Sequence, residues 1–206
     1  MTNKLLLLAS IFFISCTGPG TYKIYYEAIK SQIPGDDFLV IEEEFYKEQK
    51  YSFAYFKYGS KTPILLVLAN TENGIFQWVS QDRVSIFTNK IGKIIKTIGL
   101  DHDIYLSNYE VITDLSEGFT FYTNFYDPEL LNILTLNKKL SNEIIEYEVF
   151  RDKLVLATKI RYLSELPAIK QINKNQYLID KDGKALSSTQ RIHPFLPQIE
   201  MYFYYK

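Results

Sequence analysis

A two-residue alternation of side chains runs through much of this chain and limits the folds open to it. In LVLATKIRY, Leu154 to Tyr162, every second residue faces one way, and the two faces carry different side chains. The C-terminal QIEMYFYY repeats the arrangement, because Ile199, Met201 and Phe203 alternate with polar or aromatic neighbours. Successive side chains of a β-strand point to opposite faces, so both stretches are predicted strands.

Further strands are predicted at SFAYFKY, ILLVLAN, IFQWVS, RVSIFT, IIKTI, FTFYTNFY and EIIEYEVF, with hairpin turns at TENG and DKDG. Helical spacing occurs near the N-terminus, in YKIYYEAIKSQI and in VIEEEFYKEQ. We therefore expect an all-β fold, an antiparallel sandwich or barrel-like sheets, with one or two short helices near the N-terminus. A barrel of the outer-membrane type is disfavoured, since ILLVLA is apolar on both faces.

An apolar run from Leu5 to Ser15 follows the polar start Met1-Thr2-Asn3-Lys4. A membrane span needs about 20 apolar residues, so this run is too short to remain in a bilayer as a helix. It has the length of the apolar part of a secretory signal, and residues 1–15 are predicted to be a signal peptide. The only cysteine of the chain, Cys16, follows immediately.

The residues before Cys16, Phe13-Ile14-Ser15, resemble the lipobox of bacterial lipoproteins, although Phe13 stands where leucine is usual. In that class the cysteine becomes the first residue and carries acyl chains, and two or more chains anchor a protein stably. The alternative is that Cys16 is only a small residue in an ordinary signal peptide. Thr17 stands where an aspartate commonly retains Gram-negative lipoproteins at the inner membrane, so outer-membrane location is expected, with the domain facing the periplasm.

Residues 16–21 are read as the lipidated cysteine and a Gly- and Pro-containing tether, and residues 22–206 as a single β-rich domain. The formal net charge of the chain is −1, and there is no basic excess of the kind that nucleic-acid binding requires. Neither internal repeats nor a Pro- or Gly-rich interior linker is evident. The expected partners are the membrane, through the lipid on Cys16, and export proteins or a polysaccharide, with no nucleic acid.

The central stretch NGIFQWVSQDRVSIFTNKIGKIIKTIGL, residues 73–100, is more informative than its neighbours. It carries a Trp, a polar turn with Asp, a strand, and a G-basic-I-x-x-T-x-G-L signature. Its matching residues are Trp78, Asp82, Gly92, Lys93, Ile94, Thr97, Gly99 and Leu100. Together with PILLVLAN upstream, and with YLIDKDGKALSSTQRIHP downstream, which contains Gln190 and Pro194, it resembles the group 4 capsule polysaccharide lipoprotein family, also called YjbF or GfcB. Residues 101–147 match least.

The resemblance implies an all-β outer-membrane lipoprotein associated with capsule or exopolysaccharide production, with no established catalytic residue. The motif residues are therefore interpreted as structural. Gly92 and Gly99 bracket a predicted strand and would supply positive φ in its flanking turns. Asp82 would bond backbone amides in a turn, and Trp78 would anchor the core.

Few residues invite a chemical role. GKIIKTIG lacks the spacing of a phosphate-binding loop, and neither G-x-S-x-G nor H-E-x-x-H occurs. In DHD, residues 101–103, His102 would point away from both carboxylates if the segment were a strand, whereas in a loop the three could converge on a metal. His193, in RIHPF, is expected to be a solvated turn histidine. We predict no catalytic residue, metal or cofactor, although a carboxylate pair for glycoside cleavage stays open among the 24 acidic residues.

The chain is rich in aromatic residues, with 17 Tyr and 14 Phe. Tyr202 and Tyr204 lie opposite the apolar stripe of the last strand, where they could stack on sugar rings or contact a partner. The alternative is that this face is a second buried surface, covered by another sheet or by a helix. Three functions are considered, of which the first is favoured: a non-enzymatic accessory factor in capsule or exopolysaccharide secretion or assembly, a glycan-binding module using exposed aromatics, and a polysaccharide-modifying enzyme.

Overall fold

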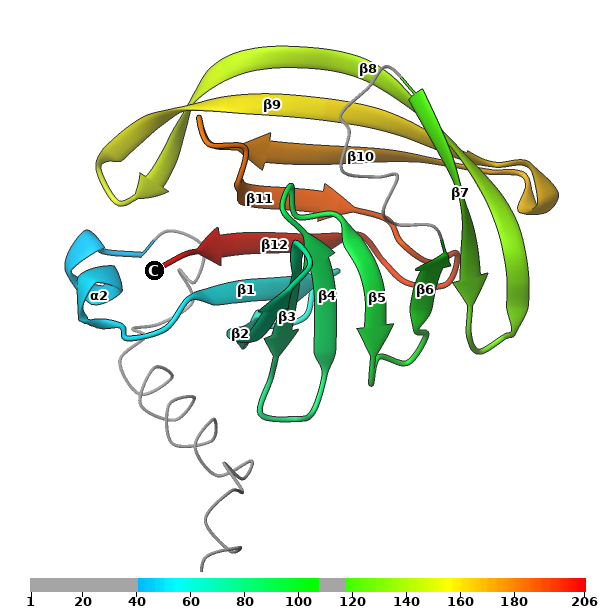
Figure 1. The fold of residues 1–206 in the computed structure, drawn as a ribbon, viewed down its shortest axis with the longest axis horizontal. Coiled ribbons are helices and arrows are strands. Elements are labelled where there is room, and N and C mark those ends of the chain that lie inside the picture. Colours follow the sequence, from blue (N-terminus) through cyan, green and yellow to red (C-terminus); the bar gives the residue numbers. More distant parts are fainter. Residues whose placement is uncertain (1–40, 108–117) are drawn as a thin grey trace, which may run out of the picture.

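The computed structural model describes residues 41–107 and 118–206, and within them the chain forms a closed antiparallel barrel of twelve strands (Figure 1). Each strand pairs with its neighbours in sequence, and β1 also pairs with β12, which closes the barrel. The prediction of an all-β, antiparallel fold is confirmed, and of the two architectures left open the barrel is the one observed. A closed barrel leaves no strand edge unpaired.

The strands are β1 (Phe53–Tyr58), β2 (Ile64–Glu72), β3 (Ile75–Val79), β4 (Ser85–Asn89), β5 (Ile94–Ile98), β6 (Ile104–Ser107), β7 (Gly118–Phe125), β8 (Leu130–Phe150), β9 (Lys153–Leu166), β10 (Gln171–Ile179), β11 (Ala185–Gln190) and β12 (Ile199–Tyr204). Among the described residues, the helix α2 (Glu43–Glu48) precedes β1 and a 3-10 turn, η2 (Pro167–Ile169), joins β9 to β10. No helix in these ranges is both long and apolar enough to cross a membrane.

The predicted elements and the observed ones agree in most places. Helix α2 lies within the predicted helical stretch VIEEEFYKEQ, and the TENG and DKDG turns connect β2 to β3 and β10 to β11. EIIEYEVF is only the end of β8, and the prediction missed β6, β10, β11 and the first half of β8. The first predicted helix, the signal peptide at residues 1–15, Cys16 and the tether at residues 16–21 lie outside the described residues.

The interior of the barrel is packed with apolar side chains on the side formed by β1 to β4 and β12. Trp78 on β3 is fully buried there, and its indole nitrogen donates a hydrogen bond to the Thr88 hydroxyl at 3.0 Å. The ring of Phe203 lies 5.4 Å from that of Trp78. Trp78 is therefore a core anchor, as predicted from the alternation of its strand.

The turn between β4 and β5 reaches across the interior to β11, which is not a neighbour of either strand. The Ala185 backbone amide donates to the Lys90 carbonyl oxygen at 2.9 Å. At Gly92 the backbone has a φ of +80°, and an added Cβ would lie 2.8 Å from the Cβ of Ala185 and 2.9 Å from the ring of Phe203. Glycine at this position thus supplies both the predicted positive φ and the close approach of the turn to the opposite wall.

A second apolar cluster lies on the outer face of β1 and β12, under α2 and the tip of the β8–β9 hairpin. The hairpin arches over the other strands and its tip comes down beside α2 (Figure 1). Phe150 at this tip lies 4.9 Å from the Tyr46 ring, and Phe45 of α2 lies 6.1 Å from the Phe53 ring. Ion pairs join the same two elements, Arg151 to Glu42 at 2.9 Å and Lys153 to Glu43 at 2.7 Å.

We predict that Gly92→Ala lowers the free energy of unfolding by about 2–4 kcal/mol, because it combines a left-handed backbone with overpacking against Ala185. Gly74→Ala is the matched control, since Gly74 has a φ of +76° but nothing within 4 Å of an added Cβ. It should cost only the backbone strain, about 1 kcal/mol. Urea unfolding of both variants tests the difference, and equal losses would contradict the close approach described for Gly92.

Candidate functional site

Gln190, at the end of β11, makes four hydrogen bonds across and along the barrel interior. Its amide nitrogen donates to the Gly92 carbonyl oxygen at 2.8 Å and to the Ser188 hydroxyl at 3.0 Å. Its amide oxygen accepts from the Ile94 backbone nitrogen and from the Tyr177 hydroxyl, both at 3.1 Å. Both lone pairs of that oxygen and both amide protons are therefore used, and the β4–β5 turn is held against β11.

Polar side chains continue from Gln190 around the inner wall, on β7 to β10. The Asn175 amide donates to the Ser164 hydroxyl at 2.8 Å, and the Ser164 hydroxyl donates to the Asn137 amide oxygen. On the other side, the hydroxyls of Thr123 and Thr135 share a hydrogen bond of 3.1 Å. We call this set the polar girdle; its members are Thr123, Thr135, Asn137, Ser164, Asn173, Asn175 and Gln190.

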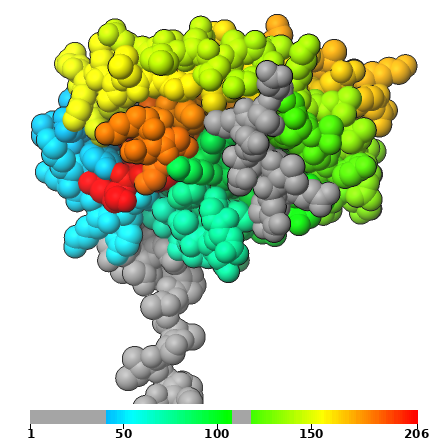
Figure 2. Space-filling view, turned by 45° about the horizontal axis from the view of Figure 1, so that its top comes forward, coloured from blue at the N-terminus to red at the C-terminus, as the bar shows by residue number. Residues whose placement is uncertain are grey.

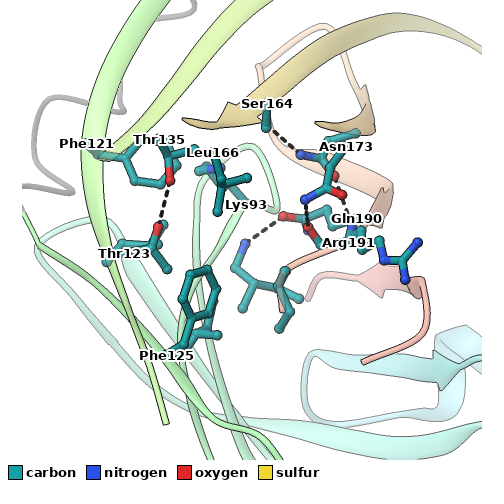
Figure 3. A pocket seen from close by; sticks show the side chains of 15 residues that line it. Lys93, Phe121, Thr123, Phe125, Thr135, Ser164, Leu166, Asn173, Gln190 and Arg191 are labelled. Atoms are coloured by element: carbon teal, nitrogen blue, oxygen red, sulfur yellow. Dashed lines mark hydrogen bonds between the residues drawn. The ribbon is translucent and has the colours of Figure 1, made fainter. Parts of the chain in front are cut away.

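A cavity of about 30 Å³ lies between the polar girdle and Lys93, and Figure 3 shows Lys93 between the threonine pair and the amide side chains. The volume is enough for roughly two water molecules. Phe121, Phe125 and Leu166 complete its apolar side. The cavity is thus polar and small, and a sugar ring does not fit in it.

Lys93 begins the segment that enters β5, and its side chain is held inside the barrel with 6% of its surface exposed. Its ammonium lies 4.6 Å from the centre of the Phe121 ring, a cation–π contact. Within the described residues it forms no ion pair. Burial without a counter-charge disfavours the charged form, which lowers the pKa of Lys93 to about 8.

Two histidines stack beside this region without forming a metal site. The ring of His193 lies 4.9 Å from that of His102 at an interplanar angle of 12°, so their nitrogens do not converge on one point. Burial lowers the pKa of His193 to about 4, and the charge of His102 acts in the same direction. The prediction of a solvated His193 is wrong, because the residue is only 1% exposed and packs edge-on against Phe125.

The DHD segment is a loop, and its side chains turn in different directions. Asp103 accepts hydrogen bonds from the Thr97 hydroxyl and from the backbone of Gly99 and Leu100, so its carboxylate organises the loop after β5. Asp101 accepts from the Tyr58 hydroxyl at 2.9 Å. In the described ranges no three His, Cys, Asp or Glu side chains are grouped to hold a metal ion.

A family model described as "Group 4 capsule polysaccharide lipoprotein gfcB, YjbF" matches residues 26–203. The chain belongs to this family. Among solved structures, it is similar to the hypothetical lipoprotein YmcC from Escherichia coli (K12), with 16% identity, a TM-score of 0.69, and coverage of 93% of this chain and 98% of that one. A putative lipoprotein from Parabacteroides distasonis matches with 8% identity, a TM-score of 0.31, and coverage of 77% of this chain and 95% of that one. The curated proteins contain no match.

The YmcC likeness supports the barrel fold alone, whereas the YjbF family match covers most of the chain. The structure shows where the motif residues that suggested this family lie. Gly92, Lys93 and Gln190 meet where the β4–β5 turn contacts β11, although they are about 100 residues apart in sequence. Thr97 and Gly99 are joined through Asp103, and Gly99 has the expected positive φ of +88°.

Two motif residues lie at turns on the surface side of the barrel. Asp82 is exposed between β3 and β4, and within the described residues it makes no hydrogen bond; the Ser80 hydroxyl accepts from the Val84 amide instead, at 3.1 Å. The expected bonding of Asp82 to backbone amides is therefore not observed. Pro194 is the second residue of a turn in which the Leu196 amide donates to the His193 carbonyl oxygen.

Tyr202 and Tyr204 lie on the outer face of β12, but other elements of this YjbF family member cover them. Tyr204 is 5% exposed, and its ring stacks on Phe53 at 4.9 Å and lies near Phe150 of the hairpin tip. Tyr202 is half-buried and donates to the Glu200 carboxylate at 2.9 Å. Neither ring offers an open face for a sugar, and the second buried surface considered for this side of the strand is the one observed.

The covering hairpin itself exposes an aliphatic surface on its other side. Ile144, Leu154 and Leu156 are 74%, 60% and 69% exposed. Leu156 pairs with Glu146 and Leu154 with Glu148 across the two strands, so these five side chains share one face. We call them the hairpin face. Nothing in the sequence distinguished it, because Leu154 and Leu156 continue the same stripe that is buried further along β9 at Ile160 and Tyr162.

Replacement of Lys93 by Met is predicted to change the pH dependence of stability. The pKa is about 8 in the folded barrel and near 10.5 in the unfolded chain, so the unfolded chain binds more protons between these values. Stability of the wild type therefore rises as the pH increases from 8 to about 10.5, and the buried cation costs roughly 3 kcal/mol below pH 8. Lys93→Met should be the more stable protein at pH 7, with a difference that shrinks towards pH 10.

Urea unfolding at several pH values measures this difference. Lys96→Met is the control, since Lys96 lies three residues after Lys93, on β5, but its side chain packs over the Phe87 ring on the outer face. A stability difference between wild type and Lys93→Met that stays constant with pH would show that Lys93 is not buried as a free amine.

Proposed function

We propose that this YjbF family member is an outer-membrane lipoprotein, anchored by acyl chains on Cys16, whose domain faces the periplasm. In this proposal it is a non-enzymatic accessory factor in capsule or exopolysaccharide secretion or assembly, and it acts by contacting a protein of the export machinery. The family match supports the link to capsule polysaccharide, and the lipobox-like residues before Cys16 support the anchor.

The interior of the barrel argues against action on a polymer inside it. The cavity beside Lys93 holds roughly two water molecules, and apolar side chains fill the opposite half. A polysaccharide chain therefore has no path through the barrel. Contact with a protein partner, or with a polymer chain as a whole, must take place on the outer surface.

The hairpin face is the observation that carries the proposal. Ile144, Leu154 and Leu156 stand at an exposure of 60–74% on a rigid pair of long strands. Grouped exposed aliphatic residues are unfavourable in water and commonly mark an interaction surface. Figure 2 shows that the yellow-green surface of β8 and β9 extends across the width of the molecule, beside the blue surface of α2.

The composition of the hairpin face favours a protein partner. Sugar rings stack on aromatic side chains, and this face carries none. Glu146 and Glu148 lie directly across the strands from Leu156 and Leu154, and their negative charge opposes contact with an anionic lipid surface. The complementary partner presents apolar side chains flanked by Lys or Arg, since opposite charges at the rim guide association.

The double variant Ile144→Asp/Leu156→Asp tests this proposal in cells that depend on the protein for surface polysaccharide. An interface anchor contributes about 2 kcal/mol or more, so its loss weakens the contact by about thirtyfold. Surface polysaccharide should fall sharply while the amount and anchoring of the lipoprotein stay normal. Ile172→Asp is the control, because Ile172 is 63% exposed but lies on β10, away from the hairpin tip.

Photo-crosslinking from position 156 identifies what covers the face. Crosslinks to one export protein support the proposal, whereas crosslinks to lipid would replace it with a membrane contact. Wild-type polysaccharide levels in the double variant would contradict the role of the hairpin face.

A second candidate function is glycan binding. The surface that favours it carries Tyr105 and Tyr122 and differs from the Tyr202 and Tyr204 surface first considered. Tyr105 and Tyr122 are 37% and 43% exposed on the outer face of β6 and β7. Tyr105 pairs with Asn124 and Tyr122 with Ser107, which places the two tyrosines diagonally on one face. Exposed rings on a flat strand surface can stack on sugars and bond them through their hydroxyls.

If glycan binding is the function, Tyr105→Ala/Tyr122→Ala should weaken binding of the cognate purified polysaccharide with the fold intact. Tyr51→Ala provides the control, since Tyr51 is 38% exposed before β1. Co-elution of polymer and protein in size exclusion measures the binding. Equal retention of polymer by all three proteins would exclude this surface.

A further inference from the structure

Several hydrogen-bond donors at the cavity inside the barrel are not fully used. The amide oxygen of Gln190 accepts from the Ile94 backbone nitrogen and the Tyr177 hydroxyl. The amide oxygen of Asn175 accepts from the Arg191 backbone nitrogen, and that of Asn173 accepts from the Gln171 side chain. The amide nitrogens of Asn173 and Asn175 each donate one hydrogen bond and retain a second proton. Thr123 and Thr135 have two hydroxyl protons but share one hydrogen bond, so one proton remains there as well.

Lys93 adds three further donors and a positive charge. Its side chain is more than nine-tenths buried and lines the cavity, and in the described part of the chain it has neither a carboxylate nor any other hydrogen-bond acceptor. None of the fifteen residues that line the cavity is Asp or Glu. Arg191, at the edge, directs its guanidinium away from Lys93 in Figure 3. A buried amine in such surroundings lacks the partner that buried charges usually have.

We propose that this cavity is an anion site that takes one carboxylate group, bound by the Lys93 ammonium with donors of the polar girdle around it. A carboxylate is acceptor-only and offers about four lone-pair directions, which can take up the ammonium protons of Lys93 and the unused protons of Asn173, Asn175 and the threonine pair. Its two oxygens occupy about the space of two water molecules, which is what the cavity provides. A bound carboxylate would also favour the charged amine and raise the depressed pKa of Lys93.

This proposal does not rest on the hairpin face, because the cavity lies inside the barrel and none of its lining residues belongs to that face. It explains why a lysine is held inside the barrel, where methionine of similar length would fill the space without a desolvation cost. The carboxylate can be a free small ion or the acid group of a larger molecule such as a uronic acid, whose ring is too large for the cavity and would have to stay outside it. The two sources share their chemistry and differ in size.

Formate and glucuronate are the probes, titrated against the full-length chain in detergent at constant ionic strength and near-neutral pH. The melting temperature should rise saturably with formate for the wild type. In Lys93→Met the apparent affinity should fall by about tenfold or more, the loss expected for one charge-assisted hydrogen bond. The control Lys96→Met should respond as the wild type does.

A second measurement needs no variant. NMR of the side-chain nitrogen of ¹⁵N-labelled lysine follows the titration of Lys93, which is distinguished by its pKa near 8. Formate should raise this pKa and leave the other lysines unchanged.

The outcomes separate the alternatives. Stabilisation by formate alone identifies a free small carboxylate as the ligand, and stabilisation by glucuronate as well identifies an acid group carried on a sugar. The proposal fails if neither probe raises the melting temperature of the wild type more than that of Lys93→Met and formate leaves the pKa of Lys93 unchanged. The cavity then holds only water.

Discussion

The four hydrogen bonds of Gln190 are the constraint on which the inside of this barrel depends. Two of them, to Gly92 and Ile94, join β11 to the β4–β5 turn and the start of β5, which are not its neighbours in the sheet, and so hold opposite walls at a fixed separation. The other two, to Ser188 and Tyr177, fix the orientation of the Gln190 amide. Because that turn is held inward, Lys93 is buried and Gly92 has no room for a side chain. Gly92, Lys93 and Gln190 of the family motif thus belong to one tertiary contact, made by residues from two distant parts of the chain.

The inner and outer surfaces of the barrel have different roles in packing and in possible contacts. The side around Trp78 is dry and apolar and supplies most of the packing. The side lined by the polar girdle keeps a small cavity beside a buried lysine, which costs stability and is for that reason a candidate for function rather than folding. On the outside, α2 and the hairpin tip cover the tyrosines of β12 and leave the aliphatic residues of the hairpin as the exposed surface.

The sequence predicted most strands whose inward side chains are apolar, such as β1, β4 and β12. It missed β6, whose inward Ile104 and Leu106 are apolar, because a strand of four residues shows too little alternation. It missed β10, β11 and the first half of β8 because their inward positions carry polar residues, among them Asn173, Asn175 and Gln190. The signal was present, since these polar side chains also recur at a period of two, but polar alternation alone does not show which face is inside. Burial of His193 and cover over Tyr204 depend on contacts between distant segments, which no local pattern contains.

The ion pairs between α2 and the hairpin tip also affect how the protein responds to a pulling force. The described chain enters through Ile41 and α2, so a pull from the N-terminal side meets the Glu42–Arg151 and Glu43–Lys153 contacts before it meets β1. These contacts are exposed and individually weak, whereas every strand behind them is paired on both sides. Tension from the N-terminal side would therefore detach α2 from the hairpin first and uncover the Phe53 and Phe150 rings that α2 contacts, while the barrel keeps its shape.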